Sequence, residues 1–248
     1  MTAERDDDGR LRELASGLDR TRARIEAACE VAGRDLAGVH LIVVTKTWPT
    51  SDVLALAELG VADVGENKAG ELRAKRDECA AMAPSTSLTW HFIGQIQSNK
   101  AREIARCADV VHAVDRPKLL AGLSRGAQER IDAGASARLA CLVQVSLDPQ
   151  PSPGRGGATP EQALALADQI AGTEGLALRG VMGVAPLGGD PREAFITLRE
   201  IADRVAATHP GADWMSAGMS GDLEQAVAAG ATHLRVGSAV LGSRPPLG

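Results

Sequence analysis

The sequence predicts an α/β fold: a single-domain TIM (β/α)8 barrel with one extra helix at its N-terminus. Apolar, strand-like runs alternate with amphipathic helical stretches along the chain, and this alternation occurs eight times. Eight consecutive strand–helix units close into a parallel barrel, and 248 residues are an ordinary length for one such domain. A doubly wound open sheet is the alternative topology.

The N-terminal region is predicted to have two parts. Residues 1–10 are acidic and polar, which excludes a signal peptide and predicts a flexible start. The barrel domain is then expected over residues 11–248. Its first element is a helix over 11–33, where apolar residues recur at steps of three and four with charges between them. This helix would cap the barrel or lie beside it.

The strands and helices that follow are predicted from apolar runs and their periodicity. The eight strand candidates cover residues 40–46, 62–66, 89–94, 110–114, 138–146, 178–184, 213–217 and 233–237. The helical candidates between them cover 50–59, 68–82, 98–107, 116–133, 160–173, 190–208 and 220–229. Residues 148–159 are rich in proline and glycine, and they predict a long loop at the functional end of the barrel.

Composition excludes several classes of partner. The net charge is −5 and aromatic residues make up only 2%, so neither a basic surface nor stacking side chains indicate nucleic-acid binding. No apolar run approaches the roughly 18 residues of a membrane helix. Four widely spaced cysteines indicate neither a zinc site nor a disulfide framework, which favours the reducing cytoplasm. We expect a small-molecule partner and, without an exposed apolar stripe, a monomer.

Lys46 ends the apolar run 41–46, at the carboxyl end of the first predicted strand. Side chains alternate along a strand, so Ile42, Val44 and Lys46 share one face. In a barrel that position lies at the mouth, where active sites form. A buried lysine loses its proton more easily and can form a Schiff base, whereas a rim lysine extends its ammonium group into solvent. Position alone favours neither interpretation.

Arg235 lies within the last predicted strand, on the same face as His233 and Gly237. A strand covered on both sides rarely holds an unpaired charge. One interpretation is therefore a structural ion pair with a carboxylate such as Glu66. The other is a hydrogen bond to the pyridine nitrogen of pyridoxal 5'-phosphate (PLP). Because arginine stays protonated, it would keep that nitrogen unprotonated and make the ring a weaker electron sink.

Two loops rich in small residues and hydroxyl groups follow the last two predicted strands, at residues 216–221 and 237–238. Barrel enzymes often bind phosphate at the loops after strands seven and eight. Ordinary turns also use glycine and serine, so either loop alone is weak evidence. Both loops together, opposite Lys46 and beside Arg235, predict a pocket for PLP.

Asn67 and two histidines complete the candidate residues. Asn67 follows the second predicted strand, where it could contact the cofactor ring or its hydroxyl, or cap the next helix. His91 and His112 lie on neighbouring predicted strands. A metal site would need further convergent ligands, which the sequence does not indicate. We therefore expect hydrogen-bonded core histidines and no metal.

These segments resemble, over nearly the whole chain, the YggS/PROSC family of PLP homeostasis proteins. The matching stretches are VVTKT (43–47), GEN (65–67), WHFIGQIQSNK (90–100), SAGMSGD (216–222) and THLRVGSAVLGSR (232–244). The resemblance implies a barrel of the alanine racemase N-terminal type, with PLP held by Lys46 as an internal aldimine and Arg235 facing the pyridine nitrogen. It also implies a phosphate site formed by Ser216, Gly218, Met219, Ser220, Gly237 and Ser238.

The chain departs from the family pattern at two positions. The loop after the fifth strand usually carries a lysine before its glycine, where this chain has Arg155. The positive charge is kept, but a role for a lysine amine there is in doubt. Ser238 stands where threonine is also common, and the hydroxyl is kept.

The resemblance favours a non-catalytic PLP carrier or regulator of vitamin B6 balance in the cytoplasm, with PLP-dependent apoenzymes as candidate partners. The alternative is an amino-acid racemase with weak activity. Racemases of the alanine type set a tyrosine, from a second domain and a partner subunit, opposite the lysine, and this sequence contains no tyrosine. A third hypothesis is a barrel that binds another phosphorylated metabolite, with Lys46 as a simple cation.

Overall fold

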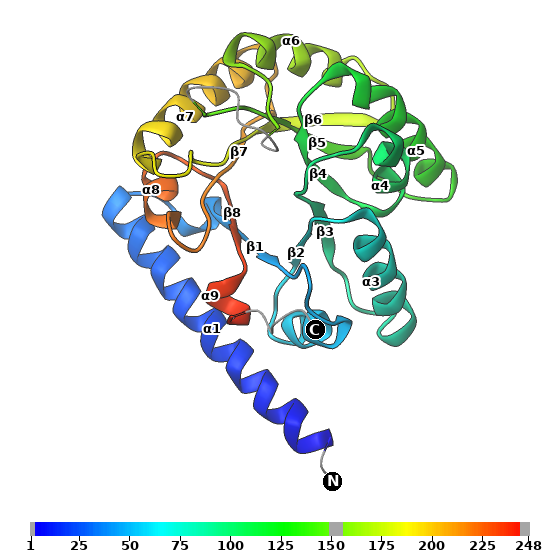
Figure 1. Cartoon of the computed structure of the whole chain (residues 1–248), viewed down its shortest axis with the longest axis vertical. Coiled ribbons are helices and arrows are strands. Elements are labelled where there is room, and N and C mark those ends of the chain that lie inside the picture. The colour runs from blue at the N-terminus through cyan, green and yellow to red at the C-terminus, as the bar shows by residue number, and fades with distance from the viewer. Residues whose placement is uncertain (1–2, 149–155, 244–248) are drawn as a thin grey trace.

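Eight parallel strands pair in chain order, and the last closes back onto the first (Figure 1). The computed structural model describes residues 3–148 and 156–243, with side chains from residue 8 onward. The strands are β1 (His40–Val44), β2 (Asp63–Glu66), β3 (Thr89–Phe92), β4 (Val110–Val114), β5 (Leu139–Gln144), β6 (Leu176–Met182), β7 (Trp214–Ser216) and β8 (His233–Val236). The predicted barrel is confirmed, and the open-sheet alternative is wrong.

Helices form a ring outside these strands (Figure 1). They are α1 (Ala3–Ala32), α2 (Thr50–Glu58), α3 (Ala69–Met82), α4 (Ala101–Cys107), α5 (Leu120–Asp132), α6 (Pro160–Ala171), α7 (Pro191–Thr208), α8 (Leu223–Ala228) and α9 (Ser238–Leu241). Short 3-10 turns cover Leu36–Gly38, Ser98–Lys100 and Pro117–Leu119. The sequence did not predict α9, a single turn directly after β8.

The long helix α1 begins at Ala3, earlier than residue 11, where the sequence predicted its start. Ion pairs support its polar first turns. Arg12 pairs with Asp8 one turn earlier at 2.7 Å, and Arg10 reaches Asp52 on α2 at 2.7 Å. Composition could not indicate the second pair, because its partner is distant in the sequence.

Several strands are shorter than predicted at their carboxyl ends. β1 stops at Val44 because the next residue, Thr45, directs its carbonyl and its hydroxyl to side chains of α3 and β2. β5 stops at Gln144, and Val145 forms a bridge to Ala158 and donates its backbone N–H to the Met182 carbonyl at 2.8 Å. Of the long loop predicted over 148–159, residues 149–155 lie outside the described part, and Arg155 with them.

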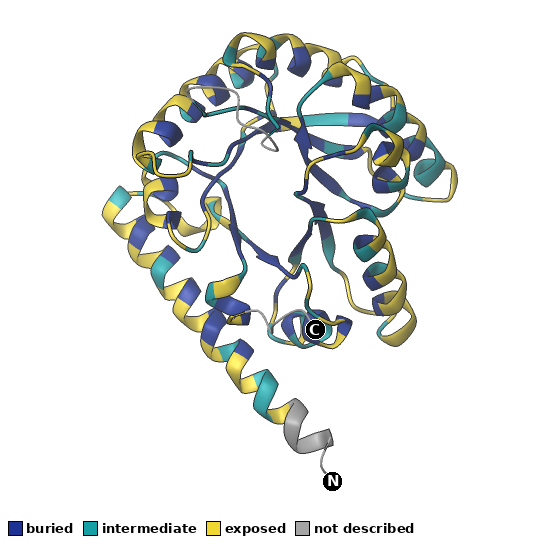
Figure 2. Ribbon diagram, viewed as in Figure 1, coloured by how far each residue is buried: buried dark blue, intermediate teal, exposed yellow. Residues whose placement is uncertain are grey.

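The apolar core lies between the strands and the helices, and Figure 2 shows each helix burying its inner face against the strands. Outward-facing strand residues such as Val43, Val64 and Phe92 belong to it. The space inside the barrel is more polar. His112 on β4 contacts Ser216 on β7, and because these strands are not neighbours, that hydrogen bond has to cross the barrel.

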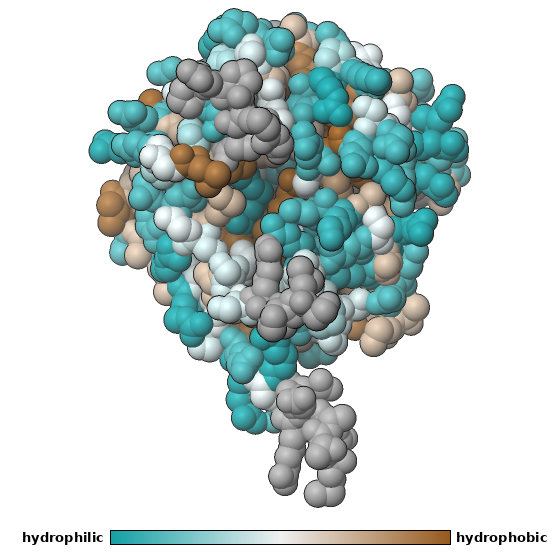
Figure 3. Space-filling model, in the orientation of Figure 1, coloured by the Kyte–Doolittle hydropathy of each residue, from teal (hydrophilic) through white to brown (hydrophobic). Residues whose placement is uncertain are grey.

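The outer surface carries no continuous apolar area on the face seen in Figure 3, where hydrophobic residues are scattered among hydrophilic ones. Among the described residues, no helix combines the length and apolar character needed to span a membrane.

α1 runs along the outside of the barrel against α8 and α9 (Figure 1). The contact with α9 depends on Gly17, because a Cβ atom there would lie 2.3 Å from the backbone oxygen of Val240. α9 begins at Ser238, in one of the predicted phosphate loops, so the packing of α1 supports that loop from behind.

Replacing Gly17 by alanine is therefore expected to destabilise the fold by about 1–3 kcal/mol, the usual cost of overpacking. Urea unfolding followed by circular dichroism measures the change. Gly9→Ala in the same helix is the matched control, since nothing lies within 4 Å of its Cβ position. Alanine at residue 9 should be neutral or stabilising by up to about 1 kcal/mol. Equal effects of both substitutions would contradict the close approach of α1 and α9.

Candidate functional site

A cavity of about 300 Å³ opens at the carboxyl ends of β1 and β8. Most of the residues predicted from the sequence line it: Lys46, Met219, Ser220, Arg235, Gly237 and Ser238. Residues not predicted complete the lining: Val44, Trp48, Ile93, Gly221 and Gly242. Strand alternation could have identified Val44, which shares a face with Lys46.

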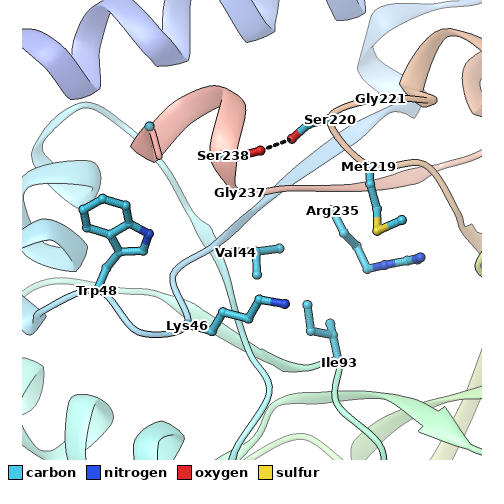
Figure 4. A pocket seen from close by; sticks show the side chains of 11 residues that line it. Val44, Lys46, Trp48, Ile93, Met219, Ser220, Gly221, Arg235, Gly237 and Ser238 are labelled. Atoms are coloured by element: carbon cyan, nitrogen blue, oxygen red, sulfur yellow. Dashed lines mark hydrogen bonds between the residues drawn. The ribbon is translucent and has the colours of Figure 1, made fainter. Parts of the chain in front are cut away.

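The side chains of Lys46 and Arg235 are directed into the same space (Figure 4). Val44 and Ile93 lie beside Lys46, and Met219 lies beside Arg235. The cavity therefore places an amine and a guanidinium together between apolar side chains. A planar ligand with one reactive carbonyl and one ring acceptor could contact both groups.

Lys46 lies two residues beyond the end of β1, rather than within the strand as predicted. Its neighbour Thr45 is held from two sides. The Thr45 hydroxyl donates to Glu66 Oε1 at 2.7 Å, and Lys75 Nζ donates to the Thr45 carbonyl at 2.7 Å. Lys75 also forms a buried ion pair with Glu66 at 2.7 Å. This lysine brace, formed by Thr45, Glu66 and Lys75, fixes the backbone directly before Lys46.

The residue after Lys46 is fixed as well. Thr47 adopts a left-handed backbone conformation with φ of 70°, which is uncommon for a β-branched residue. Its N–H donates to Glu71 Oε1 at 2.5 Å, and Glu71 in turn lies 3.2 Å from Lys75 Nζ. The lysine brace and Glu71 therefore define the turn that directs the Lys46 side chain into the cavity.

Glu66 is fully buried, and burial raises its pKa, while Lys75 and Thr45 act in the opposite direction through their hydrogen bonds. The interpretation in which Glu66 pairs with Arg235 is wrong, because its ionic partner in the structure is Lys75. The sequence offered no signal for this pairing beyond the position of Lys75 on the helix that follows β2.

Arg235 is 5% exposed and makes its hydrogen bonds to neutral groups. Nη1 donates to Ser216 Oγ at 2.6 Å, and Nη2 donates to the Gly183 carbonyl at 2.9 Å. Burial lowers the pKa of Arg235 to about 10, so it is still charged at neutral pH. No carboxylate forms a salt bridge with it in the part of the chain that the structure describes. Its charge therefore favours an electron-rich or anionic ligand in the cavity.

Ser216 and Gly218, two of the predicted phosphate contacts, lie behind the cavity wall. Ser216 was expected to bind phosphate, but it is fully buried, it does not line the cavity, and its hydroxyl lies between Arg235 and His112. Gly218 does not line the cavity either. With φ of 88° it allows the turn after β7, and its carbonyl accepts the backbone N–H of Arg235 at 2.9 Å. Both residues support Arg235 from behind the cavity wall.

The loops after β7 and β8 supply the hydroxyl groups that a phosphate site is expected to have. Ser238 Oγ donates to Ser220 Oγ at 3.2 Å, which brings the loops after β7 and β8 together (Figure 4). Gly237 packs closely on β1, because a Cβ atom there would lie 3.2 Å from the Val44 carbonyl oxygen. These loops bring two hydroxyls and the backbone of small residues to one side of the cavity.

Asn67 lies apart from this cavity and lines an adjoining one, which shares Ile93 with it. It does not cap α3, because Lys68 occupies the N-cap position. The Asn67 Oδ1 atom is buried and has no hydrogen-bond partner among the described residues. The amide is therefore able to accept a hydrogen bond from a ligand.

The two histidines on neighbouring strands are hydrogen-bonded residues of the barrel interior. His91 Nδ1 and His112 Nε2 lie 2.9 Å apart inside the barrel, so the rings are hydrogen-bonded to each other. Across the described ranges 3–148 and 156–243, the histidine, cysteine and carboxylate side chains form no cluster suited to a metal ion.

Comparison with known proteins agrees with this geometry. A family model for the alanine racemase N-terminal domain matches residues 17–245. The chain is 41% identical over 242 residues to the pyridoxal phosphate homeostasis protein of Mycobacterium tuberculosis, covering 94% of this chain and 93% of that protein. It is also similar to the structure of PipY from Synechococcus elongatus with PLP bound, with a TM-score of 0.76, 30% identity and coverage of 92% and 100%.

A more distant likeness concerns the fold alone. Alanine racemase from Streptomyces coelicolor matches with a TM-score of 0.66 at 17% identity. The match covers 95% of this chain but 59% of the racemase. The same barrel therefore occurs within a longer enzyme.

The lysine brace generates a stability prediction. Lys75→Met removes one partner of a buried ion pair, and we expect it to destabilise the protein by about 3–5 kcal/mol at neutral pH. Chemical unfolding measures the loss. Lys100→Met is the matched control, because its ion pair with Glu103 is exposed and should contribute less than about 1 kcal/mol.

The loss in Lys75→Met should also depend on pH. A carboxyl group whose pKa is raised in the folded state destabilises that state progressively as pH rises from the ordinary value through the raised one. Without Lys75, the pKa of Glu66 rises further, so the cost should be largest at neutral pH. It should shrink as the pH is lowered toward about 5, where Glu66 can be protonated. A cost independent of pH would show that Glu66 is not the group left unpaired.

Proposed function

This chain belongs to the family of the alanine racemase N-terminal domain, and we propose that it binds PLP on Lys46 and serves PLP homeostasis rather than catalysis. The observation that carries this proposal is the convergence of Lys46, Arg235 and the paired hydroxyls of Ser220 and Ser238 on one cavity. When bound, PLP supplies an aldehyde that condenses with an amine and a ring that withdraws electrons from the attached group.

Each part of the cavity suits one part of PLP. Lys46 provides the amine for the Schiff base. Arg235 provides a donor that stays protonated, so the ring nitrogen facing it would remain an unprotonated acceptor. The hydroxyls of Ser220 and Ser238, with the backbone of Met219 and Gly237, would hold the phosphate.

Of three further predicted contacts, two are revised and one is kept. Ser216 and Gly218 would act on PLP only through Arg235, because neither lines the cavity. Asn67 is kept as a contact to the ring hydroxyl, because its buried amide oxygen lacks a partner among the described groups and the adjoining cavity shares Ile93.

The proposal of a non-catalytic role rests on which side chains could donate and accept protons in racemisation. Racemisation needs a proton donor and a proton acceptor on opposite faces of the bound amino acid, and Lys46 would supply one of them. The sequence holds no tyrosine to supply the other. An arginine at the ring nitrogen also weakens the electron sink that a carbanion requires. A carrier needs neither feature, and PLP-dependent apoenzymes would be its partners.

The cellular compartment and the oligomeric state of the protein are proposed on separate grounds. Cys29, Cys79, Cys107 and Cys141 are all free thiols, as expected in a reducing cytoplasm. We propose a monomer because the sequence shows no exposed apolar stripe.

The anchor is tested with Lys46→Ala, which should abolish covalent attachment of PLP. The purified protein is incubated with PLP, reduced with borohydride and digested, and the peptides are analysed by mass spectrometry. Wild type should carry one pyridoxyl group on Lys46, and Lys118→Ala, at an exposed position, should match it. Pyridoxyl label at full stoichiometry in Lys46→Ala would contradict the assignment, and no uptake by wild type would leave another phosphorylated metabolite as the ligand.

The catalytic alternative is tested with the PLP-loaded protein and L-alanine. We expect D-alanine to form far more slowly than the roughly 1–1000 turnovers per second of ordinary enzymes. Chiral chromatography of the product measures the rate, with Lys46→Ala as the blank. Turnover in the enzyme range that depends on Lys46 would favour a racemase.

A further inference from the structure

A continuous line of hydrogen-bonded side chains crosses the barrel interior from Arg235 to Asp63. Arg235 Nη1 donates to Ser216 Oγ at 2.6 Å, and Ser216 Oγ lies 2.9 Å from His112 Nδ1. His112 Nε2 lies 2.9 Å from His91 Nδ1, and His91 Nε2 lies 2.9 Å from Asp63 Oδ1. We call these five residues the interior relay. It joins β8, β7, β4, β3 and β2 in that order.

The interior relay is unusual for a barrel of this kind. Barrel interiors are mostly filled by branched apolar side chains, and a polar group there is costly unless it is hydrogen-bonded. Ser216, His112 and His91 are at most 1% exposed, whereas the side chain of Asp63 is 25% exposed. The relay therefore has one end at the candidate PLP cavity and one end in contact with solvent.

The donors and acceptors allow one arrangement with neutral rings. Arginine has no acceptor, so Ser216 accepts from Arg235. Burial lowers the pKa of His112 well below its ordinary value, so His112 is neutral and carries one N–H. When Ser216 donates to His112 Nδ1, His112 donates from Nε2 to His91 Nδ1. His91 then donates from Nε2 to Asp63, and every group in the line is satisfied.

A second arrangement contains one more proton. When His91 is protonated, both of its nitrogens are donors, so Nδ1–H donates to His112 Nε2. His112 remains neutral, but its own proton now sits on Nδ1 and points at Ser216. Ser216 then accepts from His112 and from Arg235, and its hydroxyl proton turns away from the line. The balance is one proton taken up from solvent. The N–H bond at His112 Nε2 is replaced by one at Nδ1, a new N–H bond forms at His91 Nδ1, and the hydrogen bond between Ser216 and His112 reverses its direction.

We propose that the interior relay positions Arg235. We also propose that the strength of the hydrogen bond between Ser216 and Arg235 depends on the protonation of His91. In the neutral arrangement Ser216 donates to His112, and this polarises its oxygen into a stronger acceptor for Arg235. In the protonated arrangement Ser216 accepts twice and loses that polarisation. Ser216, His112, His91 and Asp63 are thus positioning residues, with Arg235 held more firmly at the higher pH.

The charges around His91 are those of the relay and its near neighbours. His91 faces Asp63 on β2 and His112 on β4, with His40 on β1 and with His233 and Arg235 on β8 also nearby. Burial alone would raise the pKa of Asp63, but the hydrogen bond and charge of His91 outweigh it and lower that pKa. Burial lowers the pKa of His233 to about 3, so that ring is neutral. The Asp63 carboxylate is the anionic group in direct contact with the His91 ring.

The direct test is nitrogen NMR of the histidine rings in the protein without PLP. Spectra of protein labelled with ¹⁵N in histidine are recorded between about pH 8 and about pH 5. We expect His112 to carry its proton on Nε2 at the higher pH and on Nδ1 at the lower pH, as His91 becomes doubly protonated. One tautomer of His112 throughout the range would overturn the proposal. The wild-type measurement needs no variant that could fail to fold.

A variant shows whether Asp63 controls the change. Asp63→Asn removes the carboxylate, so the midpoint of the tautomer change should move down by about 1 pH unit or more. Asp213→Asn is the matched control, because Asp213 is an exposed aspartate directly before β7 and makes no contact with the relay in the described structure. A midpoint unchanged by Asp63→Asn, or moved equally by both variants, would overturn the assignment.

The effect on the cofactor rests on the proposed function and is measured separately. In the PLP-loaded protein, the visible absorption band should change with pH at the midpoint found for His112, and Asp63→Asn should move both midpoints together. A visible absorption band that does not change at the His112 midpoint would overturn the proposal that the relay acts on PLP through Arg235. Failure to take up PLP would overturn the proposed function, while the NMR result would still decide the relay.

Discussion

A guanidinium group buried at the mouth of a barrel is the constraint on which this structure depends most. Arg235 is charged and lies away from solvent, so its N–H groups require acceptors. The structure supplies neutral ones, Ser216 and the Gly183 carbonyl, instead of a carboxylate. The positive charge consequently remains available to a ligand in the cavity. It also requires a polar barrel interior, because Ser216 itself needs a partner and finds it in His112.

On the other side of the cavity, the structure has to direct the flexible side chain of Lys46. Lys46 sits in a short turn whose two neighbours are both tied to buried or partly buried side chains. The lysine brace uses an ion pair whose charges compensate each other inside the protein. On the Arg235 side, the positive charge thus remains available to a ligand. On the Lys46 side, a buried ion pair holds the backbone rigid. The two polar systems perform separate tasks.

The prediction from sequence succeeded where local pattern and chemistry agree. The apolar runs around residues 41–44 and 110–114 are strands in the structure, and Lys46 and Arg235 line one cavity, as the sequence predicted. It failed where a partner is distant in the chain. The ion pair between α1 and α2 joins Arg10 to Asp52, and the buried orientation of Ser216 depends on His112 and Arg235.

The sequence by itself determined the barrel, the pair Lys46 and Arg235, and the hydroxyl loops after the last two strands. These follow from periodicity and from the rule that the ends of parallel strands meet at one mouth. Only the tertiary structure decided which groups hold those residues. Glu66 could have paired with either cation, and Ser216 could have faced either the cavity or the interior. Such choices depend on distances across the barrel, which alternation along a strand cannot specify.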